Sequence, residues 1–208
     1  MSDSCLKYRS VHSLRTGQQR NSHPFIETLE SRTLLAVSLD ANGWTVVTPS
    51  ADSRIVYVSS SAGSDTNTGL SESNPVQSLA KGISLLRSGY PDWLLLKRGD
   101  VFYDNFGIWE KGGRSPDEPL LVSAYGTGPR PELRTGLSSG LLTTGSTNNS
   151  VAFIGISFYA NGRDPSSADY AGNTHTTGIS WVSGTDSLLI EDCVFRYYAG
   201  GVTAQKYV

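Results

Sequence analysis

The chain has no long hydrophobic run. No segment of its 208 residues approaches the roughly 20 consecutive apolar residues that a membrane-spanning helix needs. The amino terminus carries basic residues but no apolar stretch of about 7–15 residues after them, so it does not match an ordinary secretory signal peptide. The longest apolar run there is Leu34–Val37. We therefore expect no transmembrane segment, and these absences leave the cellular compartment open.

The sequence also lacks an excess of either charge and a cysteine framework. With 17 Lys and Arg against 19 Asp and Glu, the formal net charge is −2, and the charges are interspersed. We expect no nucleic-acid partner, because no basic stripe is present. The two cysteines, Cys5 and Cys193, lie far apart, so no disulfide framework is expected. Cys193 is interpreted as a small buried apolar residue, with a reactive thiol as the alternative.

Glycine, serine and threonine are abundant. The 22 glycines and a hydrophobic share of 38% indicate many turns and short strands. Residues 1–24 are polar and without periodicity, which predicts disorder. The stretch Phe25–Asp40 fits either a short amphipathic helix or a bare tail. We assign residues 1–50 to a disordered amino-terminal segment of the export or sorting type.

That assignment to export depends on a short motif. Leu29–Leu35 reads LESRTLL and resembles the LEPRxLL segment near the amino termini of many large planctomycete surface or exported proteins. Ser31 stands where that family has proline. The resemblance implies an extracellular or cell-surface location.

After this segment the sequence changes to strands and turns. Ile55–Val58 is predicted to be a strand, and a polar loop with turn residues follows it. Asn74 and Pro75 are expected to open a helix as N-cap and first helical residue, with Gln77 placed for a capping-box bond. Gly89 ends this helix. Its apolar stripe comprises Leu79, Ile83 and Leu86.

Four β-forming segments without intervening helices come next (93–103, 119–126, 150–162 and 187–201), which predicts an all-β domain. Val151–Phe158 aligns with Leu188–Phe195 at an offset of 37 residues. A competing spacing of 23 residues relates Gly155, Gly178 and Gly201, and we retain it only for the last two. On this interpretation residues 159–177 contain an insertion. Such repeats indicate a solenoid, whose first rung the helix would cap.

Five pieces of sequence occur in order: VYVSSSAGSDTNTGLSESNPVQSLAKGI, LLLKRGDVFYD, PLLVSAYGTGPRPEL, VAFIGISF and LLIEDCVF. Together they resemble the start of a parallel β-helix protein of the pectate-lyase-like superfamily. The resemblance implies an all-β fold for residues 51–208, a right-handed parallel β-helix with an amino-terminal capping helix.

The same resemblance implies a function. Most members are extracellular lyases or hydrolases of acidic polysaccharides, and others are non-catalytic binding or structural proteins. The lyases neutralise the uronate carboxylate with a cation or an arginine, and a Lys, Arg or His base removes the adjacent proton. That site lies well downstream of the cap. We therefore expect an amino-terminal fragment whose catalytic residues are unknown and lie beyond residue 208; a Ca²⁺ cofactor is implied by the resemblance only.

Within the chain, the polar insertion Asn161–Thr177 is the main candidate for a substrate-binding site. A long loop on the side of a solenoid can wall a sugar groove, where aromatic rings stack on pyranose faces. The alternative is an ordinary solvated insertion with His175 as a surface residue. The candidate residues are Arg163, Asp164, Asp169, Tyr170 and His175.

The adjacent carboxylates Glu191 and Asp192 need a separate interpretation. Alternation along the strand would point Leu188 and Ile190 inward and Glu191 outward. Asp192 aligns with Gly155 at a corner, where a short aspartate can bond its own backbone. We therefore expect a turn residue and one weak substrate-groove candidate, Glu191, and no acid/base pair.

Other motifs are interpreted structurally. Gly63–Gly69 has oxygens at alternate positions but lacks the glycine and glutamate of an EF-hand, so we expect a turn network and assign no metal ligand. In the Arg98-Gly99-Asp100 triplet, Gly99 is expected to make a turn between strands. The four tryptophans are assigned to the core: Trp44, Trp93, Trp109 and Trp181.

Three hypotheses remain: an exported polysaccharide lyase or glycoside hydrolase, a non-catalytic surface β-helix that binds glycans or serves as a stalk, and an inactive fragment. Polysaccharide is the expected partner in the first two. The full-length protein is expected to be a monomer, and the fragment to associate through its exposed last rung.

Overall fold

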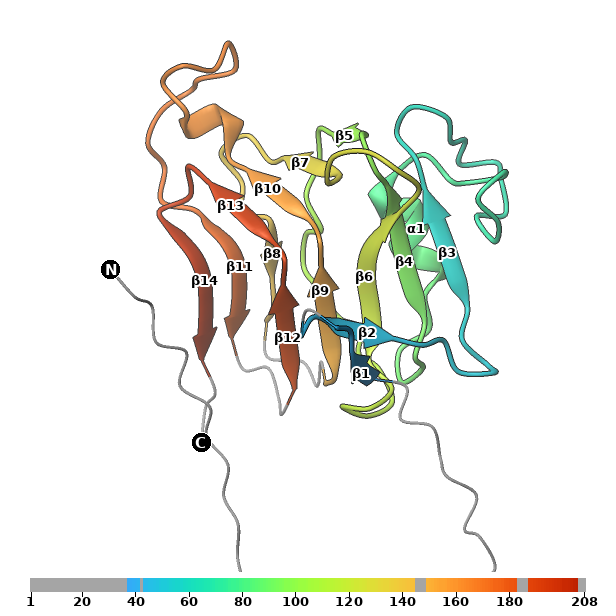
Figure 1. Ribbon diagram of the computed structural model, residues 1–208. Helices are drawn as coiled ribbons and strands as arrows, with labels where there is room; N and C mark the ends of the chain where they lie inside the picture. Colours follow the sequence, from blue (N-terminus) through green and yellow to red (C-terminus); the bar gives the residue numbers. More distant parts are fainter. Residues whose placement is uncertain (1–36, 42, 145–148, 183–186, 206–208) are drawn as a thin grey trace, which may run out of the picture. The chain divides into compact units, whose positions relative to one another are not determined.

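The computed structural model describes residues 37–41, 43–144, 149–182 and 187–205 (Figure 1). The LESRTLL segment and most of the predicted disordered tail lie outside these residues. Most of the described part consists of parallel strands stacked in three sheets, and a separate two-stranded antiparallel sheet precedes them. Among the described residues, no helix has the length and hydrophobicity needed to cross a membrane.

Each of the last three coils adds one strand to each of the three parallel sheets, whereas the earlier coils contribute to fewer of them. The five-stranded sheet runs β3 (Ile55–Val58), β4 (Trp93–Lys97), β6 (Leu120–Tyr125), β9 (Val151–Ile154) and β12 (Leu188–Glu191). The four-stranded sheet runs β5 (Val101–Phe102), β7 (Glu132–Arg134), β10 (Ser157–Tyr159) and β13 (Val194–Arg196). The three-stranded sheet runs β8 (Leu141–Leu142), β11 (Thr177–Val182) and β14 (Gly200–Gln205). All neighbouring strands in these sheets are parallel, which confirms the predicted all-β parallel β-helix.

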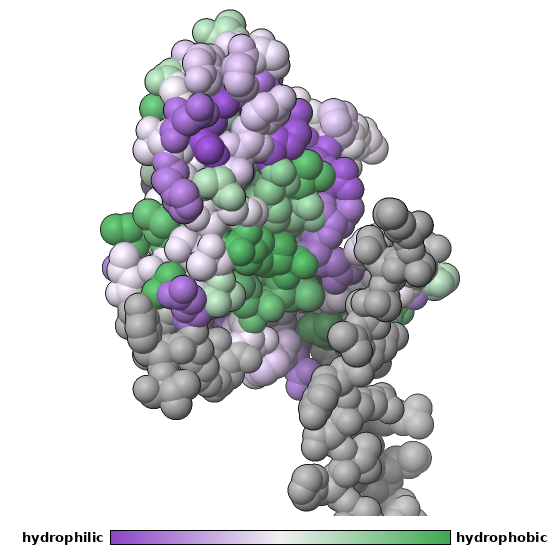
Figure 2. All heavy atoms as spheres, turned by 90° about the vertical axis from the view of Figure 1, so that its left-hand side faces the viewer, coloured by the Kyte–Doolittle hydropathy of each residue, from purple (hydrophilic) through white to green (hydrophobic). Residues whose placement is uncertain are grey.

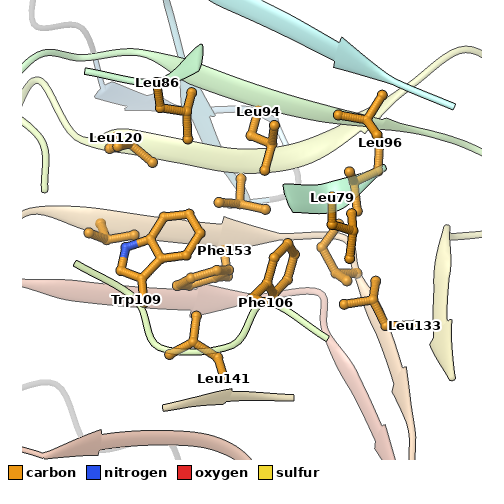
Figure 3. Close-up of a cluster of buried hydrophobic side chains, with 14 of the residues drawn as sticks. Leu79, Leu86, Leu94, Leu96, Phe106, Trp109, Leu120, Leu133, Leu141 and Phe153 are labelled. Atoms are coloured by element: carbon orange, nitrogen blue, oxygen red, sulfur yellow. The ribbon is translucent and has the colours of Figure 1, made fainter. Parts of the chain in front are cut away.

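The core lies between the sheets and is stacked from coil to coil. Leu94, Val122 and Phe153 occupy one inward column of the five-stranded sheet, because their strands pair in that register. Phe106 and Trp109 come from an irregular segment and fill the space between the sheets, where both contact Phe153 edge-on or tilted (Figure 3). Each buried side chain of this size contributes about 1.5–3 kcal/mol to stability.

The register confirms the predicted offset of 37 residues. Val151 pairs with Leu188, and the rings of Phe158 and Phe195 stack with centroids 5.0 Å apart. The 23-residue spacing is also present in one place, where Ile179 pairs with Val202. The predicted insertion lies between β10 and β11 and includes the 3-10 helix η1 (Asn161–Arg163).

The helix α1 (Leu79–Leu85) begins later than the sequence predicted. Asn74 was expected as N-cap, but Val76 forms a parallel bridge with Val58 and exchanges backbone hydrogen bonds with Tyr57 and Ser59. This pairing holds residues before the helix in an extended conformation. Prediction from local motifs missed it because the competing partner, β3, is distant in sequence.

The observed N-cap is Ser78, whose Oγ accepts a hydrogen bond from the backbone N–H of Lys81. The α1 helix packs on the first rung through Gly82, where a Cβ atom would lie 2.6 Å from a methyl group of Val58 and 2.9 Å from one of Leu94. The helix therefore covers the core at the β3 end, as a cap would.

Part of the segment 1–50 is ordered, contrary to the prediction. β1 (Val37–Leu39) and β2 (Thr45–Val47) form an antiparallel hairpin. Asp40 stabilises its turn, because its carboxylate accepts the backbone N–H of Trp44 at 2.9 Å. Trp44 itself is 51% exposed, so its predicted core position is wrong. Trp109 and Trp181 are buried as predicted.

The last coil lies at one end of the described stack. It leaves one edge unpaired in each of β12, β13 and β14. Figure 2 faces this end of the solenoid and shows apolar surface near its middle. Several side chains that point toward the core are only partly buried here, and Val202 is exposed. The partly buried side chains are Leu188, Ile190, Cys193, Phe195 and Tyr198.

Candidate functional site

A row of tyrosine and arginine side chains crosses the outer face of the four-stranded sheet. The register places Arg134, Tyr159 and Arg196 side by side on β7, β10 and β13. Tyr103 directly follows β5, whose Phe102 pairs with Leu133. The preceding residues Leu133, Phe158 and Phe195 point to the core, so alternation turns the row outward. We call Tyr103, Arg134, Tyr159 and Arg196 the tyrosine–arginine row.

Cation–π contacts hold the row together. The guanidinium carbon of Arg134 lies 5.4 Å from the ring centroid of Tyr103 and 5.9 Å from that of Tyr159. The guanidinium carbon of Arg196, on the strand that flanks Tyr159 opposite Arg134, lies 4.3 Å from the Tyr159 ring centroid. Such contacts contribute about 0.5–1 kcal/mol each at exposed sites. The row is thus one connected surface across four coils.

Glu132 supplies the negative charge of this face. Arg134 donates a hydrogen bond from Nε to Glu132 Oε1 at 2.8 Å, and Arg196 donates from Nη2 to the other carboxylate oxygen. The hydrogen bond to Glu132 raises the pKa of Arg134. One carboxylate therefore neutralises part of the charge of both arginines.

Tyr197 adds a third tyrosine at the end of the row. It has a left-handed backbone, with φ of 63°, which is uncommon for a residue with a bulky side chain. Its ring centroid lies 5.9 Å from that of Tyr159, and its carbonyl oxygen accepts a hydrogen bond from Arg163 Nη1.

The predicted insertion meets the row at Asp164. The Tyr159 hydroxyl donates to Asp164 Oδ2 at 2.6 Å, and the backbone N–H and hydroxyl of Ser166 donate to Oδ1. Desolvation raises the pKa of Asp164, but these hydrogen bonds outweigh it and leave the pKa below its ordinary value. The bond to Asp164 also raises the pKa of the Tyr159 phenol. Asp164 is therefore a permanent hydrogen-bond acceptor at neutral pH.

The structure brings together only some of the candidate residues from the insertion. Arg163 and Asp164 contact the row or its end. Asp169 instead accepts a hydrogen bond from the side chain of Asn161, within the insertion. Tyr170 and His175 are exposed, and no hydrogen bond or ion pair of the His175 side chain occurs among the described residues.

Glu191 lies on another sheet. Its Oε1 accepts the backbone N–H of Thr45 at 2.8 Å, which ties the hairpin β1–β2 to β12. Its neighbour Asp192 occupies the predicted corner but bonds to Arg130, whose Nε donates to the Asp192 carbonyl at 2.9 Å and whose Nη2 donates to its carboxylate. The expected bond of Asp192 to its own backbone is thus replaced by this ion pair.

The remaining polar motifs are structural. Asp65 accepts hydrogen bonds from the backbone N–H groups of Gln77 and Ser78, each at 2.9 Å, so the predicted turn network is present. Gly99 makes the predicted turn, with φ of 84°, and Asp100 is buried between hydroxyl groups of Ser59 and Ser61. Within the described part of the chain, no group of His, Cys, Asp and Glu could hold a metal ion.

The sequence prediction named none of the four residues of the row. The offset of 37 residues places Tyr159 beside Arg196, so these two of its four residues could have been identified from the sequence. Tyr103 and Arg134 follow no constant spacing, because the earlier coils differ in length.

Comparison with known proteins supports the fold. No family model matches the chain, and no curated protein matches its sequence. Among solved structures, two crystal structures of the GH136 lacto-N-biosidase from Eubacterium ramulus are similar. The selenomethionine derivative aligns over 68% of this chain with 20% identity and a TM-score of 0.53. The native protein aligns over 68% with 19% identity and a TM-score of 0.50. The match spans 27% and 26% of the lacto-N-biosidase chains. At this identity the likeness is one of fold, and it places the chain among β-solenoid-like proteins.

Proposed function

We propose that this chain belongs to an exported or cell-surface β-helix protein that binds polysaccharide. The observation that carries the proposal is the tyrosine–arginine row, an exposed aromatic and hydrogen-bonding surface beside an insertion. The structural likeness to part of a glycoside hydrolase supports a carbohydrate-related role. The LESRTLL motif supports export.

The chemistry of the row suits a sugar chain. Tyrosine rings present flat apolar faces that match the C–H face of a pyranose, and their hydroxyl groups reach its oxygen atoms. Guanidinium N–H groups donate to sugar hydroxyls in a fixed planar arrangement. The carboxylate of Glu132 accepts hydrogen bonds from the same hydroxyls. The insertion borders this surface at Arg163 and Asp164.

Binding is better supported at this face than bond cleavage. A glycoside hydrolase needs a protonated carboxylic acid beside a second carboxylate. Asp164 has a lowered pKa and is ionised, and Glu132 is held by two arginines. Uronate lyase chemistry needs a base near the neutralised sugar, and no residue of the described part is assigned that role. An enzyme that cleaves polysaccharide, a lyase or a glycoside hydrolase, is therefore the second candidate function, after a non-catalytic surface protein that binds it.

A binding screen tests the proposal. The 208-residue chain is passed over immobilised neutral and acidic polysaccharides, with and without Ca²⁺, and retention is measured. We expect retention on at least one polysaccharide, weakened by Tyr103→Ala. Tyr90→Ala is the matched control, since Tyr90 is also exposed and contacts an arginine, Arg87, 4.0 Å from its ring centroid. No retention on any polysaccharide overturns the proposal.

Lyase chemistry is tested separately. The chain is incubated with pectate, alginate and chondroitin while ultraviolet absorbance of unsaturated products is followed. We expect no rise in absorbance. A rise on any substrate would show bond cleavage and overturn the restriction of this face to binding.

A further inference from the structure

The aromatic rings open to a ligand lie near the two ends of the tyrosine–arginine row. Tyr103 is 71% exposed, and Tyr197 is 48% exposed. The ring between them, that of Tyr159, is covered by the guanidinium of Arg196. A ligand that stacks on tyrosine can therefore do so near both ends, and meets hydrogen-bonding groups between them.

The distance between these ends is set by the sheet. Tyr103 adjoins β5 and Tyr197 adjoins β13, which are the two outer strands of the four-stranded sheet. Three spacings of about 4.8 Å separate these strands, so the rings lie on the order of 14 Å apart along the solenoid axis. A linear chain of roughly three to four pyranose residues covers such a distance at about one sugar per strand spacing.

The charges between the two ends are largely paired. Glu132 accepts hydrogen bonds from both Arg134 and Arg196, and Asp164 lies against Tyr159. An anionic sugar would have to compete with Glu132 for the guanidinium groups and would approach a second carboxylate. Uncharged hydroxyls accept hydrogen bonds from the arginines and donate to Glu132 without displacing either arginine.

The backbone of Tyr197 offers an independent observation. In the preceding coil the equivalent position is Ala160, because Arg196 pairs with Tyr159. A tyrosine in the left-handed conformation is strained where glycine would not be. Strain of this kind is retained where surrounding contacts enforce it, and it clusters at ligand sites. Here it holds an exposed ring at the end of the row.

We propose that the tyrosine–arginine row and Tyr197 bind a linear neutral oligosaccharide along the solenoid axis, with one end stacked on Tyr103 and the other on Tyr197. This inference rests on the proposed function and adds the class, orientation and minimum length of the ligand. Arg134, Arg196 and Glu132 bond the hydroxyls of the sugars along the row.

The test uses the neutral polysaccharide retained most strongly in the screen, cut into oligosaccharides from disaccharide to hexasaccharide. Binding is measured by isothermal titration calorimetry. The affinity should rise steeply up to about four sugars and then level off, since the row is about three strand spacings long. Oligogalacturonides of the same lengths are the acidic comparison and should bind at least about tenfold more weakly, a difference of about 1.4 kcal/mol.

Tyr197→Gly separates binding from folding. Glycine relieves the left-handed strain, so the thermal midpoint should stay the same or rise, while affinity for the tetrasaccharide falls about tenfold and affinity for the disaccharide changes little. Tyr90→Gly is the matched control and should leave both affinities unchanged. Calorimetry of the disaccharide also shows that the remaining site is intact.

The outcomes that contradict the inference differ from the outcome that contradicts the proposed function. Retention on acidic polysaccharides alone, or an affinity independent of length, overturns this inference and leaves the proposed function standing. Unchanged tetrasaccharide affinity in Tyr197→Gly also overturns the inference alone. Absence of binding to every polysaccharide overturns the proposed function, and the inference with it.

Discussion

Asp192 lies beside Gly155 of the preceding coil, and both residues have a left-handed backbone, with φ of 52° and 76°. They form the corner between the five-stranded and four-stranded sheets in their coils. Aspartate tolerates this conformation better than most residues, and glycine has no penalty there. The two adjacent carboxylates of the EDC sequence are thus separated by a corner, with Glu191 on one sheet and Asp192 turned toward Arg130.

Substitution of Asp192 measures how much the left-handed backbone at this corner costs in free energy of unfolding. Asp192→Ala should destabilise the protein by about 1–2 kcal/mol relative to Asp192→Gly, because only alanine has a Cβ in the left-handed region. Both variants lose the ion pair with Arg130, which is partly exposed and contributes about 0–1 kcal/mol. Urea unfolding of the two variants gives the difference. Equal stabilities would show that the corner relaxes on substitution.

The carboxylate of Asp92 should carry acid-sensitive stability. It is fully buried and accepts hydrogen bonds from the Arg87 side chain and from the backbone N–H groups of Arg87 and Arg54. Desolvation raises its pKa, but the hydrogen bonds from Arg87 and Arg54 outweigh this and lower it. A lowered folded-state pKa means that the stabilisation is present above the unfolded pKa of about 3.9 and is lost as the pH falls through the folded value.

We therefore expect Asp92→Asn to lose roughly 3 kcal/mol at neutral pH, since it leaves Arg87 without its buried partner. The difference from wild type should shrink as the pH falls below about 4. Asp52→Asn is the control, because Asp52 pairs with Arg114 at an exposed position and should cost less than about 1 kcal/mol. A constant difference between wild type and Asp92→Asn from neutral to acidic pH would contradict the assignment.

Two tyrosines with raised pKa values should make the stability of the protein fall at alkaline pH. Burial raises the pKa of Tyr198 to about 12, and burial together with the charge of Asp100 raises that of Tyr125 to about 12. A raised folded-state pKa means that the neutral phenol contributes stability below the unfolded pKa of about 10, and that this is lost as the pH rises toward the folded value. Stability should therefore fall between about pH 10 and 12.

Tyr198→Phe isolates one of these groups. At neutral pH it should cost about 1 kcal/mol, because the hydroxyl loses its 2.7 Å hydrogen bond with Thr135. Above about pH 10 the variant should lose less stability than wild type, since it has no phenol to ionise at this position. Urea unfolding over this range, with ultraviolet absorbance of tyrosinate recorded in parallel, provides the comparison. Parallel pH profiles would refute the assignment to Tyr198.

The parts of the fold that the sequence predicts are those set by repetition. Val151 and Leu188 begin two segments with matching apolar positions, so their pairing follows from the sequence alignment alone. The helix start was misplaced because Val76 pairs with Val58, a tertiary contact that local capping motifs do not reveal. The hairpin was missed because its strands are short and interrupt an otherwise polar segment.

The candidate site was predicted only where it coincides with a break in the repeat. Asp164 was singled out because the insertion is polar and interrupts the coil, and it does contact Tyr159. Arg134 was not, because coils of unequal length conceal which residues share a column. Its outward position beside Tyr159 depends on the register of β7 and β10 within the four-stranded sheet, which only the three-dimensional arrangement gives.

A column of glycines should be intolerant of any side chain. Gly178 pairs in register with Gly201, and a Cβ atom on Gly178 would lie 2.3 Å from Cδ1 of Phe195 and 2.5 Å from the carbonyl oxygen of Gly201. Gly178→Ala should therefore cost at least about 2 kcal/mol in urea unfolding. Gly89→Ala is the control for backbone strain without crowding, since no atom lies within 4 Å and only its positive φ costs about 1 kcal/mol. Equal costs would show that Phe195 moves aside.

The open strand edges of the last coil predict self-association of this chain. β12, β13 and β14 each have one edge without a partner among the described residues, and Val202 is exposed beside partly buried core side chains. Unpaired edges with apolar side chains recruit further strands. We expect sedimentation equilibrium to show concentration-dependent association, and Val202→Lys to weaken it by charging the edge. Leu39→Lys, on a more exposed apolar residue of the hairpin, is the control and should leave association unchanged. A monomer at all concentrations would show that the last coil is covered in solution.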